Sequence, residues 1–409
     1  MTPMLMYPNP PAQEGSLLAF VEVFAARMRI DGYAPGSMKA STCLVKDFVT
    51  WLDQQEIAAS SVSPGHVSAY LAERWRHRRR RPGDALTLHS FTRLCSADGR
   101  ATQGERVAMT PAVRARQDFE RDLRHERGLA EPSIRLYGYA VGRFLEQVFG
   151  LDDVRLDALT GADVVRFVQT EAARLKHAKR AKVMTSALRS FLQYGRYRGD
   201  IVTDLHTGVP TVANWSMAGI PRTISASQVR NLLDACDRRN PVGRRDYAML
   251  LLLARLGLRA GEVVELRLDD IDWDEGAIRI RGPAQRCDRL PLPADVGAAL
   301  AEYLRDGRPD CSVRNVFVRS RAPRRALRGP SAVSCVVCRA LRRAGIDSPF
   351  KGAHLLRHTL ATQMLGRGAS LAEIGQILRH RSPQTTTIYA KVDLDSLRAL
   401  ALPWPGSAQ

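Results

Sequence analysis

The sequence lacks the features of a membrane or secreted protein. Its longest apolar run, Tyr247–Leu258, is too short to span a bilayer and contains Arg255. Residues 1–14 carry proline and glutamine in place of a basic segment followed by an apolar one, so we expect no signal peptide. These absences argue against a membrane protein and predict a cytoplasmic one.

Cysteine and lysine are both scarce. The seven cysteines are scattered and odd in number, unlike the disulfide framework of a small secreted domain. Cys335 and Cys338 form a C-x-x-C pair without a second pair or histidines at ligand spacing, which predicts two half-buried helix residues and no metal site. With only seven lysines, nearly all the positive charge is arginine, which binds phosphate through a planar fork of donors.

The chain is strongly basic. Its 61 Lys+Arg against 42 Asp+Glu give a formal net charge of +19. Such a charge attracts polyanions, so nucleic acid is the leading partner and an anionic membrane surface is the alternative. The length of 409 residues favours two or three domains, and 45% hydrophobic with 25% charged residues is normal for a soluble protein with buried cores.

An internal repeat occupies the first half of the chain. Five residues recur 96 positions later: Gly32, Ala34, Ser37, Val45 and Phe48 return as Gly128, Ala130, Ser133, Val141 and Phe144. Apolar residues at three- and four-residue steps predict four or five helices per copy, two of them starting at Ser63-Pro64 and Thr160-Gly161. We expect an extended or disordered segment at 1–14, an N-terminal helical DNA-binding unit at 15–105 and a second helical unit at 111–206.

Basic clusters occur in both copies. The run Arg76–Arg81 is explained equally well by a solvated face or by a DNA contact. Residues 174–198 hold eight basic side chains and no acidic one. Within this segment the candidate contacts to a DNA backbone are Lys176, Lys179, Arg180, Lys182 and Arg189. Residues 207–221, with several glycines and prolines, predict a linker.

The region 222–409 has a different pattern. Helices are expected at Tyr247–Leu258, Ala294–Leu304 and Ser331–Ala344. Alternating residues at 278–282 and 289–292 predict a short antiparallel strand pair around a loop. The predicted fold class is therefore mainly α with a small antiparallel β-sheet, in which helical DNA-binding domains precede a mixed α+β domain.

Four short motifs follow one another in this last region. They are Gly257-Leu258-Arg259-x-x-Glu262, His354-x-x-Arg357-His358, Leu378-x-His380 and Thr386-x-x-Tyr389. Taken singly, Arg259 could be the partner of a helix C-terminus, His354 a core histidine and Tyr389 a surface aromatic. In this order and at these separations, the motifs resemble the signature of the tyrosine recombinase (phage integrase) family.

The extent of the resemblance differs along the chain. It covers residues from about 111 onward, where the second helical unit resembles the family's core-binding domain and 222–409 its catalytic domain. It reaches residues 15–105 only through the internal repeat, and there it implies an additional, arm-type DNA-binding module.

The resemblance implies that DNA is cleaved and rejoined through a covalent link to the protein. A phosphodiester is shielded by its own charge, so attack needs cationic donors on its non-bridging oxygens, and Arg259 and Arg357 would supply them. Tyr389 would attack phosphorus and leave a 3′-phosphotyrosine with a free 5′-hydroxyl. His354 would assist proton transfer and His380 would donate a hydrogen bond to the phosphate. Because the linkage keeps the bond energy, neither ATP, a metal nor another cofactor is expected.

Two further residues have supporting roles in this scheme. Glu262 would orient the site. The family that the chain resembles usually carries a lysine in the strand-pair loop, where it protonates the leaving 5′-oxygen. In this sequence Pro283 stands at the matching place and no lysine occurs from 183 to 350. Arg286 is expected to give electrostatic help only, because an arginine with a pKa above about 12 is a poor proton donor. Cleavage is then slow, or a partner recombinase cuts while this chain acts as an accessory DNA-binding subunit.

The tail 392–409 is apolar near its end, with Leu397, Leu400, Leu402 and Trp404. The resemblance implies that this tail docks on a neighbouring protomer, in a tetramer of two dimers on double-stranded DNA. The alternative is that the tail folds onto its own domain.

A relaxase like the type IB topoisomerases shares the chemistry but acts as a monomer without site preference, and the repeat and the tail argue against it. The favoured function is a site-specific recombinase for integration or transposition of a mobile element.

Overall fold

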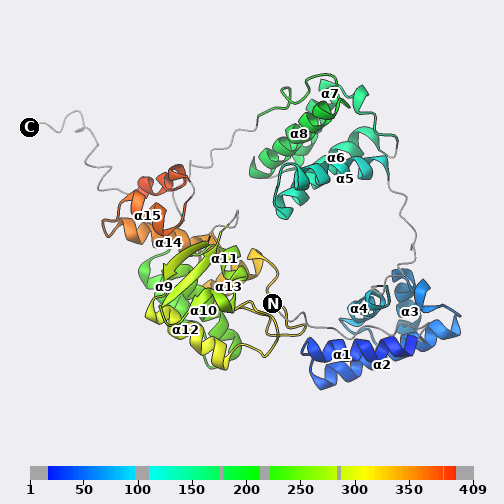
Figure 1. Ribbon diagram of the computed structural model, residues 1–409, viewed down its shortest axis with the longest axis horizontal. Helices are drawn as coiled ribbons and strands as arrows, with labels where there is room; N and C mark the ends of the chain where they lie inside the picture. The colour runs from blue at the N-terminus through cyan, green and yellow to red at the C-terminus, as the bar shows by residue number, and fades with distance from the viewer. Residues whose placement is uncertain are drawn as a thin grey trace, which may run out of the picture. The chain divides into compact units, whose positions relative to one another are not determined.

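The structure of the protein is a computed structural model. It describes residues 17–96, 110–150, 152–175, 178–211, 222–282, 287–380 and 382–392. They belong to two compact units, one made of residues 1–102 with 220–409 and the other of residues 103–219. The described chain is mainly helical with one three-stranded antiparallel sheet, which confirms the predicted fold class (Figure 1). None of its described helices is long and apolar enough to cross a membrane.

The first repeat copy folds into four α-helices and a 3-10 turn: α1 (Leu17–Ile30), α2 (Pro35–Gln54), η1 (Ala59–Ser61), α3 (Pro64–His77) and α4 (Asp84–Ser96). Their apolar faces enclose one core, in which the rings of Phe24 and Phe91 meet edge to face with centroids 5.8 Å apart. The predicted helix start at Ser63-Pro64 is confirmed, because α3 begins at Pro64 and the Ser63 backbone amide donates to Nδ1 of His66 at 3.2 Å.

The second copy repeats this plan with α5 (Pro111–His125), α6 (Glu131–Phe149), η2 (Leu156–Ala158), α7 (Gly161–Arg174) and α8 (Ala178–Arg198). The residues that recur in the sequence occupy equivalent places. Val45 and Val141 are both fully buried, as are Phe48 and Phe144. Gly32 and Gly128 both have positive φ values, +77° and +58°. The repeat in the sequence is therefore a repeat of one helical unit.

The second core extends further along the chain than the sequence predicts. Leu205, just before the segment 207–221 that is expected to be a linker, is buried in this core. Val209, within that segment, is buried in it as well. Arg189 on α8 fixes this stretch, since its Nη2 donates to the carbonyl oxygens of Val209 at 2.9 Å and Pro210 at 3.1 Å. The prediction missed this because two apolar residues among glycines and prolines show no periodicity. Residues 212–221 lie outside the described residues.

The region after 222 contains the sheet. Its elements are α9 (Ala226–Asp234), α10 (Pro241–Arg255), α11 (Ala260–Glu265), η3 (Leu268–Asp270), β1 (Ile271–Asp272), β2 (Ala277–Arg281), β3 (Cys287–Pro291), α12 (Ala294–Asp306), α13 (Pro330–Arg343), α14 (Ala353–Leu365), α15 (Leu371–Ile377), η4 (Pro383–Thr385) and η5 (Thr387–Val392). The strands pair in the order β1-β2-β3, with Ile278 opposite Leu290. Strand β1 was not predicted, because two residues cannot show an alternating pattern.

Helix α10 forms the centre of this region's core. It begins six residues before the predicted Tyr247, because Asn240 accepts a hydrogen bond from the Gly243 amide at 2.8 Å and Pro241 suits the first helical position. Its residues 248–253 are all buried, against α12, α13 and α14. A second, smaller cluster holds the last elements together and consists of Ala361, Ile374, Leu378 and Tyr389. The tail beyond residue 392 lies outside the described residues.

The core of the second helical unit provides a test of the fold. Phe144 is fully buried and its ring lies 5.2 Å from that of Phe167 and 6.4 Å from that of Phe191. We expect Phe144→Ala to lower the free energy of unfolding of this unit by about 3–5 kcal/mol, through lost burial and the cavity left behind. Native-state hydrogen exchange of the α6 and α8 amides would measure this. Leu136→Ala is the control, because the Leu136 side chain on the same helix is 57% exposed. It should change the free energy of unfolding by less than about 0.5 kcal/mol. Equal effects of the two substitutions would contradict the described core.

Candidate active site

The first three residues of the first motif, Gly257-Leu258-Arg259, lie in the turn between α10 and α11. Helix α10 ends at Arg255, and Gly257 follows with φ +59°, a conformation that favours glycine. A Cβ at Gly257 would also lie 2.6 Å from Cδ2 of Leu378. The absence of a side chain therefore lets the first motif pack directly against Leu378 of the third.

Arg259 follows this turn and directly precedes α11, so it does not lie at the end of α10. Its Nη1 pairs with Oε1 of Glu262 at 2.7 Å, and its Nη2 donates to the carbonyl oxygen of Arg379 at 3.1 Å. Oε2 of Glu262 accepts from the backbone amide of Arg259 at 2.8 Å. Glu262 thus holds both ends of Arg259, whose side chain stays 35% exposed and can meet a ligand.

Arg357 lies on α14 and is only 4% exposed. Its Nη1 donates to the carbonyl oxygen of Gly257 and its Nη2 to that of Leu378. Burial, followed by the charge of Arg259, lowers the pKa of Arg357 to about 10, so the guanidinium is still charged at neutral pH. Three separate motifs are therefore joined by one buried cation.

Tyr389 lies in η5 and is 1% exposed, so it is not a surface aromatic. Its hydroxyl is hydrogen-bonded to Nδ1 of His358 at 2.9 Å. Burial raises the pKa of Tyr389, while the charge of Arg357 lowers it. The phenol is accordingly neutral at physiological pH and has a ring nitrogen as its immediate partner.

His380 stacks on Tyr389, with ring centroids 6.4 Å apart and planes inclined by 7°. Its Nδ1 is hydrogen-bonded to Oγ1 of Thr386 at 2.7 Å. Burial, followed by the charges of Arg357 and Arg259, lowers the pKa of His380 to about 4. The imidazole is therefore neutral at physiological pH, as expected for a histidine beside two arginines.

His354 lies one helical turn before His358 on α14, with ring centroids 6.3 Å apart. It is thus on the side of α14 that faces Tyr389. The structure therefore brings all five predicted catalytic residues, together with Glu262, to one place, either by direct contact or through His358.

Two residues in this site were not predicted to have a role. His358 was visible in the second motif, but only the folded chain shows that it contacts Tyr389. Arg379 is the unspecified middle residue of Leu378-x-His380. It has φ +54°, and its buried guanidinium pairs with Oε2 of Glu262 at 2.7 Å and lies 3.6 Å from Oδ2 of Asp288 on β3. No pattern in the sequence indicates that this side chain turns inward.

The other predicted residues are placed differently. Pro283 and Arg286 lie outside the described residues, as does Lys176, and the side chain of Lys179 is not described either. Arg180 and Lys182 are exposed on α8. Arg189 is engaged by the two carbonyl groups described above, so its contact with DNA stays a prediction. Cys335 and Cys338 lie on α13, the first exposed and the second partly buried.

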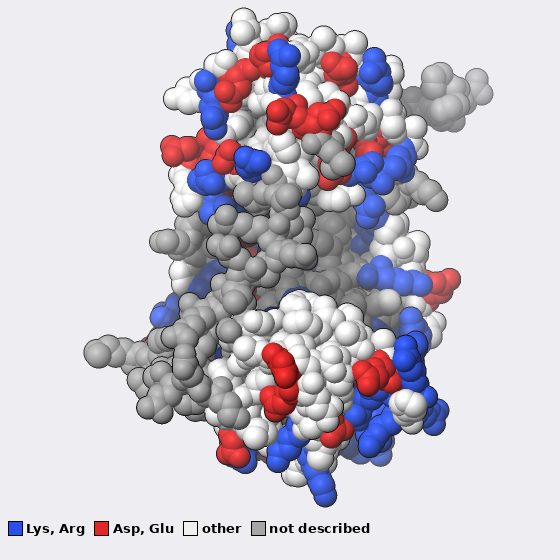
Figure 2. Space-filling view, turned by 90° about the vertical axis from the view of Figure 1, so that its right-hand side faces the viewer, with Lys and Arg blue, Asp and Glu red and all other residues white. Residues whose placement is uncertain are grey.

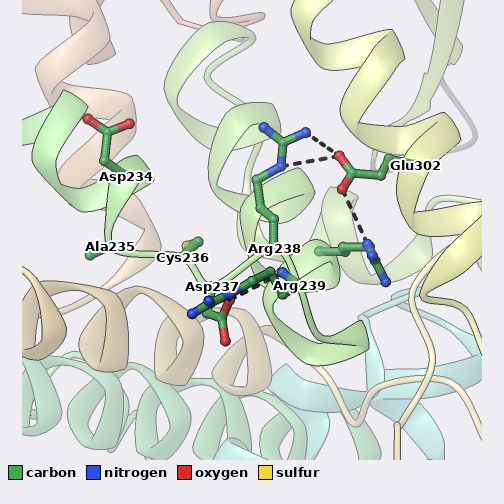
Figure 3. Close-up of a pocket in the computed structure, with 8 residues that line it drawn as sticks. Asp234, Ala235, Cys236, Asp237, Arg238, Arg239 and Glu302 are labelled. Atoms are coloured by element: carbon green, nitrogen blue, oxygen red, sulfur yellow. Dashed lines mark hydrogen bonds and ion pairs between the residues drawn. The ribbon is translucent and has the colours of Figure 1, made fainter.

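A surface hollow elsewhere in the region does not belong to this site. It is lined by the end of α9, the start of α10 and α12, and Figure 3 shows Glu302 between two arginines. Arg238 pairs with Oε2 of Glu302 and Arg244 with Oε1, the latter at 3.2 Å. No motif residue lines it, and its charges neutralise one another.

Comparisons with known proteins agree with the motifs. The model of the phage integrase family matches residues 222–395, and that of the phage integrase N-terminal SAM-like domain matches residues 117–199. A protein of Sinorhizobium fredii named as an integrase/recombinase, y4rA, is 48% identical over 397 residues, which is 97% of this chain and 96% of the relative.

Two solved structures share the fold. The XerH site-specific recombinase bound to palindromic difH substrate in a post-cleavage complex matches with a TM-score of 0.55 and 15% identity, covering 98% of this chain and 99% of XerH. A lambda integrase (75–356) dimer bound to a COC′ core site matches with a TM-score of 0.52 and 18% identity, covering 68% of this chain and 94% of the integrase. With the motifs, the matching family models and a relative similar over nearly its whole length, the chain belongs to the tyrosine recombinases of the phage integrase family, enzymes that break and rejoin DNA.

Proposed function

We propose that this protein is a site-specific recombinase that serves integration or transposition of a mobile element and works through a 3′-phosphotyrosine at Tyr389. The observation that carries the proposal is the contact of Arg357 with Gly257 and Leu378, which gathers Arg259, His380 and Tyr389 around one buried cation. The name of the relative y4rA supports a role in integration.

The charges of the site suit a phosphodiester. Arg357 and Arg259 repel each other, since each is a cation and Arg259 lowers the pKa of Arg357. An anion between them relieves this repulsion and receives planar donors on both non-bridging oxygens. The same arrangement stabilises the extra charge of the pentacoordinate state when Tyr389 attacks phosphorus.

His380 adds a donor without adding charge, because burial lowers its pKa to about 4. If Thr386 donates its hydroxyl proton to Nδ1 of His380, the neutral ring carries its own proton on Nε2. Nε2 then donates a hydrogen bond to the phosphate, as the resemblance implies for His380. His354 retains the proposed part in proton transfer, and Glu262 orients Arg259.

We assign double-stranded DNA as the partner, and divide the work among the parts of the chain. Residues 15–105 are an arm-type DNA-binding unit, 111–206 a core-binding domain and 222–409 the catalytic domain. The basic side chains of Arg76–Arg81, Arg180 and Lys182 are exposed and available to phosphates. Figure 2 shows lysine and arginine gathered at the lower right of the face it presents.

Covalent trapping tests the proposal. Wild-type protein mixed with a duplex from the ends of its own element, nicked near the cut so that cleavage cannot reverse, should form a protein–DNA adduct on denaturing gels. Tyr389→Phe removes the nucleophilic oxygen and should abolish the adduct while DNA binding persists. Tyr303→Phe is the matched control, because Tyr303 is equally buried but belongs to α12, away from the motifs.

Three outcomes would contradict this function. An adduct with Tyr389→Phe would exclude Tyr389 as the nucleophile. Tight, salt-sensitive binding without any wild-type adduct would favour the accessory subunit. Relaxation of plasmids that lack the target site would favour the topoisomerase-like activity.

The missing loop lysine predicts that departure of the 5′-oxygen limits the rate. Pro283→Lys should raise the cleavage rate at least about tenfold, because a general acid is worth about 10²–10⁴ in rate. A duplex with sulfur in place of the bridging 5′-oxygen should be cleaved faster by wild-type protein, since a thiolate leaves without protonation. An unchanged rate with Pro283→Lys and with the sulfur-bridged duplex would show that another step is limiting.

Assembly on DNA depends in this proposal on the apolar tail. Deletion of the residues after Asp393 should leave binding to one half-site but abolish dimers and tetramers on the full site, measured by native gels and light scattering. Deletion of 406–409, which lies beyond Trp404, is the control and should assemble normally. Normal assembly of the longer deletion would mean that the tail folds onto its own domain.

A further inference from the structure

We propose that His358 is the base that accepts the hydroxyl proton of Tyr389 during strand cleavage and returns it during rejoining. This makes His358 a catalytic residue in addition to those implied by the motifs. The inference rests on the proposed role of Tyr389 as the nucleophile.

Geometry supports this assignment. Nδ1 of His358 lies 2.9 Å from the Tyr389 hydroxyl oxygen, a distance at which a proton can pass between them. The ring of His380 lies nearly parallel to that of Tyr389 with centroids 6.4 Å apart, and its Nδ1 is hydrogen-bonded to Thr386. His380 is therefore placed to contact the phosphate from beside the tyrosine, while His358 contacts the oxygen that must lose its proton.

The charges around His358 keep it able to accept a proton. It is faced by His354 and Arg357 from α14, by Arg222 from the segment before α9, and by His380 and Tyr389 from the end of the chain. Burial, followed by His354, Arg357 and Arg222, lowers the pKa of His358 below its ordinary value of 6.5. The imidazole is thus neutral at pH 7, and the buried phenol opposite it cannot ionise unaided.

The step balances in atoms and electrons. A lone pair of the Tyr389 oxygen forms the bond to phosphorus as its proton moves to Nδ1 of His358. The bond from phosphorus to the 5′-oxygen breaks, and this oxygen keeps the electron pair and takes a proton from a water molecule, whose hydroxide is released to the solvent. The new imidazolium lies beside Arg357, and the negative phosphodiester offsets their repulsion. In rejoining, the 5′-hydroxyl gives its proton to a hydroxide from the solvent as its oxygen forms the bond to phosphorus. The bond from phosphorus to the tyrosine oxygen breaks, and that oxygen keeps the electron pair and takes back the proton from His358.

The test is the pH dependence of single-turnover cleavage, from pH 5 to 9, on the nicked duplex at saturating protein. Wild-type cleavage should fall on the acid side, as His358 becomes protonated, with a midpoint below pH 6.5. His358→Asn can still hydrogen-bond to the tyrosine hydroxyl but cannot take its proton. We expect it to bind DNA normally, to cleave about 10²–10⁴-fold more slowly, and to lose the acid limb, its rate rising steadily with pH instead.

A second variant guards against loss of folding. His358→Ala leaves a space in which added imidazole can act as the base, so imidazole should restore part of its cleavage rate and should leave Tyr389→Phe inactive. Rescue by an external base would not be seen if His358 only supported the structure.

Several results would overturn the inference while leaving Tyr389 as nucleophile. A wild-type rate and pH profile in His358→Asn would show that the hydrogen bond has no part in proton transfer. Faster cleavage by His358→Ala would show that the bond only holds Tyr389 inside the closed site. Loss of the acid limb in His354→Asn, with retention in His358→Asn, would assign the base to His354. Absence of a wild-type adduct would instead refute the proposed function itself.

Discussion

The site depends on one buried contact, between the guanidinium of Arg357 and the carbonyl groups of Gly257 and Leu378. These carbonyls belong to residues that follow the ends of two helices, α10 and α15, while Arg357 belongs to a third, α14. Burial of a charge is unfavourable in free energy unless the charge is hydrogen-bonded, and the two backbone carbonyl groups offset part of this desolvation free energy. The contact also fixes the geometry of the site, because one guanidinium group binds both the turn before Arg259 and the segment before His380. The residue that gathers the site is therefore also the residue expected to contact the phosphate.

Burial and the charge of Arg357 together determine the protonation of the neighbouring side chains. Burial lowers the pKa of His358 and His380 most, and the charge of Arg357 lowers both further, whereas it opposes the effect of burial on Tyr389. At neutral pH the site thus combines charged arginines with a neutral His358, a neutral His380 and a neutral phenol. Cations that cannot lose their protons suit the binding of phosphate, whereas neutral imidazoles can donate or accept a proton during the reaction. Arginines therefore serve to bind the phosphate, and histidines serve to donate or accept protons.

Much of this arrangement was predictable from sequence because its signals are local. Helix starts at Pro64 and Gly161 follow from capping residues, and the repeated valines and phenylalanines mark equivalent core positions. The motif residues were identifiable by type, order and separation. The contact between His358 and Tyr389 was not, since it joins residues 31 positions apart on different elements. Arg379 was equally hidden, because a left-handed residue other than glycine costs about 1–3 kcal/mol and no sequence rule anticipates it. Its ion pair with Glu262, which also holds Arg259, offers a physical reason for that conformation.

The most direct test of this account is to locate the covalent bond. After trapping on the nicked duplex, the DNA would be digested to a short nucleotide remnant and the protein cut into peptides for mass spectrometry. The account predicts a remnant joined through a 3′-phosphate to Tyr389, in the peptide that contains η5. A remnant on any other residue, or one joined through a 5′-phosphate, would contradict it.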